Sequence, residues 1–193
     1  MNNWSETELV RKLSEGDRMA YGVVFKLYYD RLFHFSLHYL NDSEASRDVV
    51  QDVFTNIWED CAKFSEVRNL SSWLYTACKN NCLKKLDHLK VIQKHADALK
   101  YRQLQLAQNS LFDLDTSPVT FSEINSIINN VLEQLPEQTR KIFVLSRYEN
   151  KKNREIAEEL KISTKTVEAN MTKALKLFRK SLSNYLPIAA FMI

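Results

Sequence analysis

The stretch from Asn153 to Leu175 combines helix-turn-helix spacing with an outward face of short polar and basic side chains. Ala157 is small where two helices must approach, and Val167 and Met171 lie one helical turn apart on an inward face. The residues that point away from this core are Lys165, Thr166, Glu168, Ala169, Thr172 and Lys173. Such a face can enter a major groove, where polar side chains read base edges and lysines contact phosphates or guanine. An ordinary antiparallel helix pair fits the same pattern, so the segment alone leaves both interpretations open.

Charge is distributed unevenly along the chain, although the formal net charge is only +3. Residues 42–66 carry two basic side chains against seven acids, a net of −5, whereas residues 68–94 carry six against one, a net of +5. Residues 140–180 carry twelve basic side chains against five acids, a net of +7. One charged run is usually a solvated helix face, but two basic segments in separate regions favour a polyanion as partner.

No combination of residues indicates catalysis or a bound metal. The three cysteines, Cys61, Cys78 and Cys82, have no zinc spacing and cannot all pair, which fits a reducing cytosol. His34 and His38 lie four residues apart, but neither an HExxH motif nor a third ligand accompanies them. We therefore expect no enzyme, no cofactor, no metal and no small-molecule substrate. The chain also lacks a secretory signal and an apolar run of about 20 residues, so we expect a soluble, cytoplasmic protein.

The composition favours helices because the 193 residues include only 2 glycines and 3 prolines. Tight hairpins and phosphate-cradling loops need glycine, so the fold class predicted is all-α. The apolar periodicity predicts helices over 6–40 with a break at 14–17, over 45–58, over 71–94 with Ser71 or Ser72 as cap, and over 122–135, 137–145, 153–160 and 164–185.

These elements predict two small helical domains, at residues 1–99 and 123–193. Between them, residues 100–122 are rich in amides and hydroxyls with no fixed apolar period, which predicts a flexible linker whose first part could still be helical. The end of the chain, residues 185–193, is apolar. It either folds back on the second domain or forms a strip for a partner.

Three further motifs stand in a fixed order along the chain. Residues 48–58 read DVVQDVFTNIW, residues 72–75 read SWLY, and residues 135–143 read LPEQTRKIF, and the helix-turn-helix comes next. Each motif alone is weak. In this order and spacing they make nearly the whole chain resemble the sigma factors of bacterial RNA polymerase, in particular the extracytoplasmic-function (ECF) group. The resemblance implies a subunit that binds core polymerase, recognises the minus-thirty-five and minus-ten promoter elements and assists promoter melting.

The resemblance assigns the acidic helix to the clamp coiled coil of the polymerase β′ subunit. The residues implied are Asp48, Gln51, Asp52 and Phe54. Their carboxylates and amide would meet a basic partner, with apolar area from the exposed part of Phe54. The alternative is that Phe54 and Trp58 are core, which for Trp58 is the favoured interpretation.

The next helix, which is basic, would hold the unpaired non-template strand of the minus-ten element. The residues implied for that strand are Lys79, Asn80, Lys84 and Lys85, with Phe64, Arg68 and Asn69 as candidates for a pocket that takes an extruded base. Trp73 and Tyr75 are candidates for stacking on bases. Packing of Trp73 inside, where it would orient the loop, is favoured by its helical spacing.

In the second domain, the outward face of the helix-turn-helix would read the minus-thirty-five element as duplex DNA. Lys161 stands at a turn position where glycine is common, so a positive φ there would cost backbone strain. Glu168 stands where many relatives carry a basic residue, and it could accept a hydrogen bond from a cytosine amine.

The resemblance implies further partners besides core polymerase and promoter DNA. The apolar residues Ile142, Phe143 and Leu145 could serve the polymerase β flap, although core packing explains them equally well. An anti-sigma factor, membrane-anchored or not, is also implied. The competing function is a stand-alone helix-turn-helix regulator, which gives no reason for an acidic helix followed by a basic one.

Overall fold

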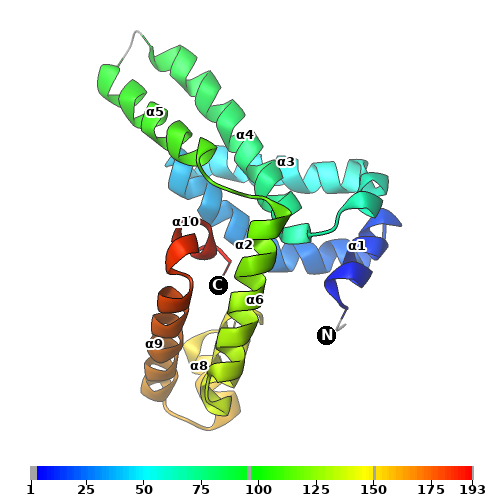
Figure 1. The fold of residues 1–193 in the computed structure, drawn as a ribbon, viewed down its shortest axis with the longest axis vertical. Coiled ribbons are helices and arrows are strands. Elements are labelled where there is room, and N and C mark those ends of the chain that lie inside the picture. The colour runs from blue at the N-terminus through cyan, green and yellow to red at the C-terminus, as the bar shows by residue number, and fades with distance from the viewer. Residues whose placement is uncertain (1–3, 95–96, 150, 193) are drawn as a thin grey trace. The chain divides into compact units, whose positions relative to one another are not determined.

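The chain folds into two helical units. The computed structural model describes residues 4–94, 97–149 and 151–192, and these contain helices and turns but no strand. The units are Met1–Phe121 and Ser122–Ile193. This confirms the predicted all-α class with two small domains (Figure 1). None of the described helices combines the length and apolarity that a membrane crossing requires.

The first unit is built from five α-helices and a short 3-10 turn. They are α1 (Glu6–Ser14), α2 (Arg18–Leu40), α3 (Ser43–Glu59), η1 (Cys61–Glu66), α4 (Leu70–Gln93) and α5 (Ala98–Phe112). Each α-helix begins after a side chain that accepts hydrogen bonds from free amides of its first turn: Ser5, Asp17, Asp42, Asn69 and Asp97. The cap of α4 is therefore Asn69, and the prediction of Ser71 or Ser72 was wrong.

The core of the first unit forms where α2, α3 and α4 pack together. The stripe predicted on α3 faces inward, with Val49, Val50, Val53 and Ile57 buried. From the other helices come Leu32, Phe35, Leu74, Tyr75, Cys78, Cys82 and Leu86, all of which are fully buried. These contacts hold α3 and α4 side by side, so their outward faces have a defined spacing.

Residues 98–112 form a helix in place of the start of the predicted flexible linker. α5 packs along α4, as the helices labelled α4 and α5 in Figure 1 show, and buries Leu104 and Leu111. Gln108 Nε2 donates to Asp87 Oδ1 at 2.6 Å, and Lys90 Nζ donates to Gln108 Oε1. The first part of the predicted linker is therefore helical, but as a separate helix that packs back on α4 and belongs to the first unit, not as a continuation of the preceding helix.

The second unit contains most of α6 (Pro118–Gln134) together with α7 (Glu137–Arg147), α8 (Asn153–Leu160), α9 (Thr164–Ser181), η2 (Ser183–Tyr185) and α10 (Leu186–Ala189). The rings of Phe143 on α7 and Phe178 on α9 stack with centroids 4.6 Å apart. Thr139 Oγ1 donates to Asn170 Oδ1 at 2.7 Å across the same pair of helices. Ser163 caps α9 by accepting from the Thr166 amide.

The turn between α8 and α9 contains a strained residue. Lys161 has φ +53°, in the left-handed region that L-residues other than glycine rarely adopt. Its position is the C-cap of α8, where glycine is common because it lacks a Cβ. The strain expected from the sequence is therefore present.

Lys161→Gly is expected to raise the free energy of unfolding of the second unit by about 0.5–1 kcal/mol, because glycine adopts this φ without steric cost. Urea denaturation followed by circular dichroism measures the change. Lys161→Ala is the matched control, since it removes the same charged group but keeps the Cβ. An equal gain in stability for alanine would show that charge, not backbone strain, is relieved.

The apolar end of the chain folds back on the second unit. The Tyr185 hydroxyl donates to Glu123 Oε2 of α6 at 2.6 Å. Leu186 and Ala189 line a cavity of about 210 Å³ with Phe178, Leu182 and Arg147. The sequence left open whether this end folds back on the second domain or forms a strip for a partner. In the structure it folds back.

Candidate nucleic-acid and partner interfaces

The outward sides of α3 and α4 form a groove of about 540 Å³ that carries both signs of charge. The α3 side contributes Asp48, Val49, Asp52, Thr55, Asn56 and Glu59, and the α4 side contributes Asn81, Lys84, Lys85 and His88. Asp48, Gln51 and Asp52 are all exposed, as the predicted docking role requires. The groove therefore presents carboxylates on one wall and ammonium groups on the other.

The groove brings together residues that the sequence assigned to different partners. Lys85 Nζ lies 3.6 Å from Asp48 Oδ2, so this lysine forms an ion pair with the acidic helix. Lys84 is exposed on the same wall. Its position allows contact with a partner in the groove as well as with a phosphate.

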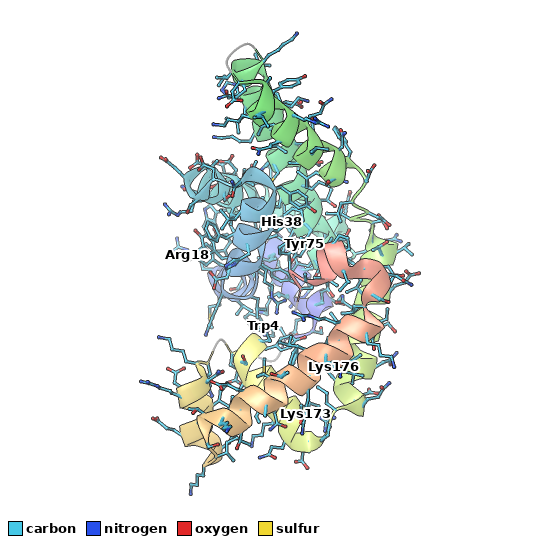
Figure 2. All side chains as sticks on the ribbon, turned by 90° about the vertical axis from the view of Figure 1, so that its left-hand side faces the viewer. Trp4, Arg18, His38, Tyr75, Lys173 and Lys176 are labelled. Carbon is cyan, nitrogen blue, oxygen red and sulfur yellow. The ribbon has the colours of Figure 1, made fainter. Side chains whose placement is uncertain are left out.

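The structure reverses the expectation for the two large aromatic residues of α3. Phe54 is 2% exposed, so it cannot contribute contact area to a partner, whereas Trp58 is 45% exposed. The Phe54 ring lies 4.8 Å from that of Phe25 on α2. Trp58 lies near the C-terminal end of α3, where the Tyr21 ring meets it edge to face at 5.5 Å and the Arg18 guanidinium lies 5.9 Å from its centroid (Figure 2 labels Arg18).

A second cavity, of about 710 Å³, opens between η1 and the first half of α4. Its lining is Lys63, Glu66, Val67, Arg68, Asn69, Ser72, Trp73, Thr76, Ala77, Asn80 and Pro118. Arg68 and Asn80 are exposed, whereas the side-chain oxygen of Asn69 accepts from the Ser72 amide. The cavity is where the sequence placed a base pocket, and it gathers three of the predicted residues.

The aromatic residues near this cavity divide between core and lining. Phe64 is 1% exposed, and its ring lies 4.5 Å from that of Trp73, so the prediction that Phe64 meets DNA was wrong. Trp73 is half-buried and lines the cavity, with the rest of its ring supported by Phe64. Tyr75 is fully buried, so its ring is not available to stack on a base (Figure 2). The same burial raises the pKa of its hydroxyl.

Lys79 is held by the chain itself. Its Nζ donates to the carbonyl oxygens of Leu114 and, at 3.3 Å, Phe112. Burial lowers the pKa of Lys79, while the charges of Asp115 and Asp113 act in the opposite direction. The free ammonium group predicted for strand binding is thus engaged at the start of the segment between α5 and α6.

The outward face of α9 is exposed to solvent in the part of the second unit that the structure describes. Val167 and Met171 are buried, as predicted, whereas Lys165, Glu168, Ala169, Thr172 and Lys173 are exposed. Thr166 is half-buried, and its hydroxyl lies 2.8 Å from Ser163 Oγ. Figure 2 shows Lys173 and Lys176 on the ribbon of α9.

Sequence reasoning missed several polar residues of the two cavities. Ser72 and Thr76 were missed, although they precede the predicted Asn80 at intervals of four residues along α4, which was a usable signal for a common face. Asn81, one position after Asn80, lies on a different face of α4 and lines the α3–α4 groove. Pro118 comes from a segment distant in sequence, and no local pattern indicates that it lies beside α4.

Two family models match the chain, one in each unit. Sigma-70 region 2 matches residues 24–90, which include α3, η1 and most of α4, and sigma-70 region 4 matches residues 126–178, which include the helix-turn-helix. Together the two matches cover more than half of the chain. Residues 91–125, which contain α5, lie outside both.

The chain is also similar to three named sigma factors over nearly its whole length. It is 22% identical over 176 residues to the ECF RNA polymerase sigma factor SigW of Bacillus subtilis (strain 168), covering 90% of this chain and 94% of that protein. It is 20% identical to the RNA polymerase sigma-H factor of Pseudomonas aeruginosa, covering 92% and 93%. It is 22% identical to the ECF RNA polymerase sigma-E factor of Haemophilus influenzae, covering 92% and 95%.

Proposed function

The chain belongs to the sigma-70 family of RNA polymerase sigma factors, in its ECF group, and from that premise we propose how its surfaces divide the work of starting transcription. As a sigma factor it is a promoter-recognising regulator of transcription initiation and not an enzyme. A stand-alone regulator is not favoured, because region 2 and region 4 matches occur in one chain. Each of its surfaces then has a partner of its own.

The α3–α4 groove is the surface that we assign to core polymerase, with the clamp coiled coil of the β′ subunit as partner. Asp48 and Asp52 line its α3 side, and Gln51 is exposed on the same helix, so these side chains can pair with basic side chains of a helical partner. Phe54 is withdrawn from this assignment because it is buried. Trp58, exposed seven residues after Gln51, supplies the apolar contact area in its place.

The cavity beside η1 is the site that we assign to the unpaired minus-ten strand. Arg68 can neutralise a phosphate, Asn80 can bond a base edge, and the half-buried Trp73 offers a ring surface for stacking. Extruding a base costs a few kcal/mol, which these contacts must recover. Lys84, one turn beyond Asn80, extends the basic surface.

The outward face of α9 is assigned to the minus-thirty-five element as duplex DNA. Lys165 and Lys173 lie eight residues apart on the exposed face and suit phosphates, while Thr172 and Glu168 suit base edges. We keep the β flap and an anti-sigma factor as expected partners. The β-flap assignment does not rest on Ile142, Phe143 and Leu145, because all three are buried.

One observation carries the assignment of separate surfaces to separate partners: α4 lines both the cavity beside η1 and the α3–α4 groove. Asn80 lines the cavity beside η1, and Asn81 lines the α3–α4 groove. Consecutive residues of a helix point about 100° apart. Asn80 and Asn81 can therefore each face a different partner, so core polymerase and an unpaired strand can be bound at the same time.

Gel-shift titration of promoter DNA with and without core polymerase tests the function. A sigma factor of this arrangement is expected to shift DNA strongly only when core polymerase is present, because melting exposes the strand that α4 binds. A stand-alone regulator would bind duplex DNA tightly by itself. Tight binding unaffected by core polymerase would overturn the proposal.

Asn80→Ala is expected to weaken binding of an unpaired minus-ten strand by the holoenzyme about tenfold, because a base-edge hydrogen bond is lost. Fluorescence anisotropy of a labelled single strand measures the effect. Asn81→Ala is the matched control, since it removes the neighbouring amide from the other cavity and should leave strand affinity unchanged. Equal losses for the two variants would remove the cavity from the DNA interface.

A further inference from the structure

The segment that joins α5 to α6 lies on the face of α4 assigned above to the unpaired strand. We name residues 112–118 the latch. Ser72 Oγ donates to the Thr116 carbonyl at 2.7 Å, and Thr76 Oγ1 donates to Thr116 Oγ1 at 2.9 Å. Leu114 and Thr116 are each only 8% exposed. The latch is therefore a packed part of the first unit, not a strand of chain in solvent.

The latch also binds a lysine of α4 that lies between these hydroxyls and the end of α5. Lys79 Nζ donates to carbonyl oxygens of Phe112 and Leu114, and the carboxylates of Asp113 and Asp115 add favourable charge. Asp115 is itself fixed, because it accepts from Thr120 Oγ1 and from the Ser117 amide. Ser72, Thr76 and Lys79 of α4 thus all form hydrogen bonds with the latch.

The groups that the latch offers to α4 are chemically those that a DNA strand offers. Carbonyl and carboxylate oxygens accept hydrogen bonds from hydroxyl and ammonium groups as phosphate oxygens do. Ser72 and Thr76 line the same cavity as Arg68 and Asn80, and Pro118 of the latch lies at its wall. A strand that followed α4 toward Lys79 would meet the latch.

We propose that the latch is an internal competitor of the unpaired promoter strand, which must displace residues 112–118 to reach Lys79, Ser72 and Thr76. This inference rests on the proposed function of the α4 face. The latch lies outside both matched family regions, because the region 2 match ends at residue 90 and the region 4 match begins at residue 126. A latch closed in nine of ten molecules lowers the apparent strand affinity about tenfold.

A reversible cross-link tests the proposal. Thr76→Cys with Thr116→Cys places two thiols where hydroxyl oxygens lie 2.9 Å apart, so side-chain rotation can bring the sulfurs to the ~2.05 Å of a disulfide bond. Cys61→Ser removes the half-buried thiol from this background, while Cys78 and Cys82 are buried. Oxidised glutathione closes the bond, and dithiothreitol opens it. The probe is a labelled single strand that the reduced holoenzyme has selected from a random pool.

The oxidised double variant is expected to bind core polymerase normally but to bind the selected strand at least about tenfold more weakly, with recovery on reduction. Each single-cysteine variant should bind the strand equally well under oxidising and reducing conditions, because it cannot form the cross-link. Equal strand affinity in the oxidised and reduced double variant would overturn the latch. So would failure of the two thiols to cross-link in the free protein, because the contact itself would then be absent.

A second pair of variants tests the opposite direction. Leu114→Ala removes a side chain that holds the latch, and the matched control Leu106→Ala removes one that is 60% exposed on α5. The first should raise strand affinity a few-fold, and the second should not. A loss of affinity for Leu114→Ala would show that the latch supports the pocket rather than competing for it. If Asn80→Ala has no effect on the selected strand, the proposed function fails instead.

Discussion

Charge reversal of Asp48 and Asp52 together is expected to weaken binding of core polymerase by at least about 30-fold. Both carboxylates are exposed on the α3 wall of the groove, so their reversal places two ammonium groups against a basic partner. Losing one partner of an interfacial charge pair typically costs about 2 kcal/mol or more, which corresponds to ~30-fold in the dissociation constant. Biolayer interferometry with immobilised core polymerase measures the loss.

The ion pair between Asp48 and Lys85 calls for a control within the same groove. Asp48→Lys with Lys85→Glu keeps the internal pair in reversed orientation, so a defect that persists arises from the partner and not from internal repulsion. Asp30→Lys reverses an exposed acid on α2 and should leave binding unchanged. Full affinity of the Asp48→Lys, Asp52→Lys variant would remove the groove from the polymerase interface.

Charge reversal of Lys165 and Lys173 is expected to weaken binding of the minus-thirty-five duplex by more than about tenfold at physiological salt. Each lysine that neutralises a phosphate releases a condensed counterion, so removing two such contacts should lower the slope of log affinity against log salt by about 2. Both side chains are exposed on α9. The measurement is a salt titration of holoenzyme binding to a duplex that contains the upstream element.

Lys180→Glu serves as the matched control for that titration, because it reverses an exposed lysine in the last turn of the same helix. It should change neither the affinity nor the salt slope by a comparable amount. An unchanged slope in the double variant would contradict the assignment of this face to DNA.

Local sequence signals were sufficient for most of the helices, though not for α5, and for the division of α9 into buried and exposed positions, with Thr166 as the exception. Asp17, Asp42 and Ser163 act as caps where short polar residues precede apolar periodicity, because a helix leaves its first amides unpaired. Val167 and Met171 point inward because they are spaced one turn apart.

Periodicity did not predict burial correctly at the edges of apolar stripes. It also did not predict contacts between segments that are distant in the sequence. Phe54 and Trp58 lie on the same stripe of α3, yet Phe54 meets the ring of Phe25 on α2 while Trp58 lies near the end of the helix and remains exposed. The contacts of Thr116 with Ser72 and Thr76 join residues at least 40 positions apart. Such pairings depend on tertiary packing, which no local pattern encodes.

The most direct test of the account is promoter-dependent transcription by purified core polymerase on a library of promoter fragments, with sequencing of the transcript 5′ ends. Addition of the wild-type chain should yield defined start sites. The Asp48→Lys, Asp52→Lys variant should yield none at the same concentration, and the Asn80→Ala variant should yield fewer transcripts from the same sites. Start sites that do not depend on the added chain, or transcription undiminished by the charge reversal, would contradict the account.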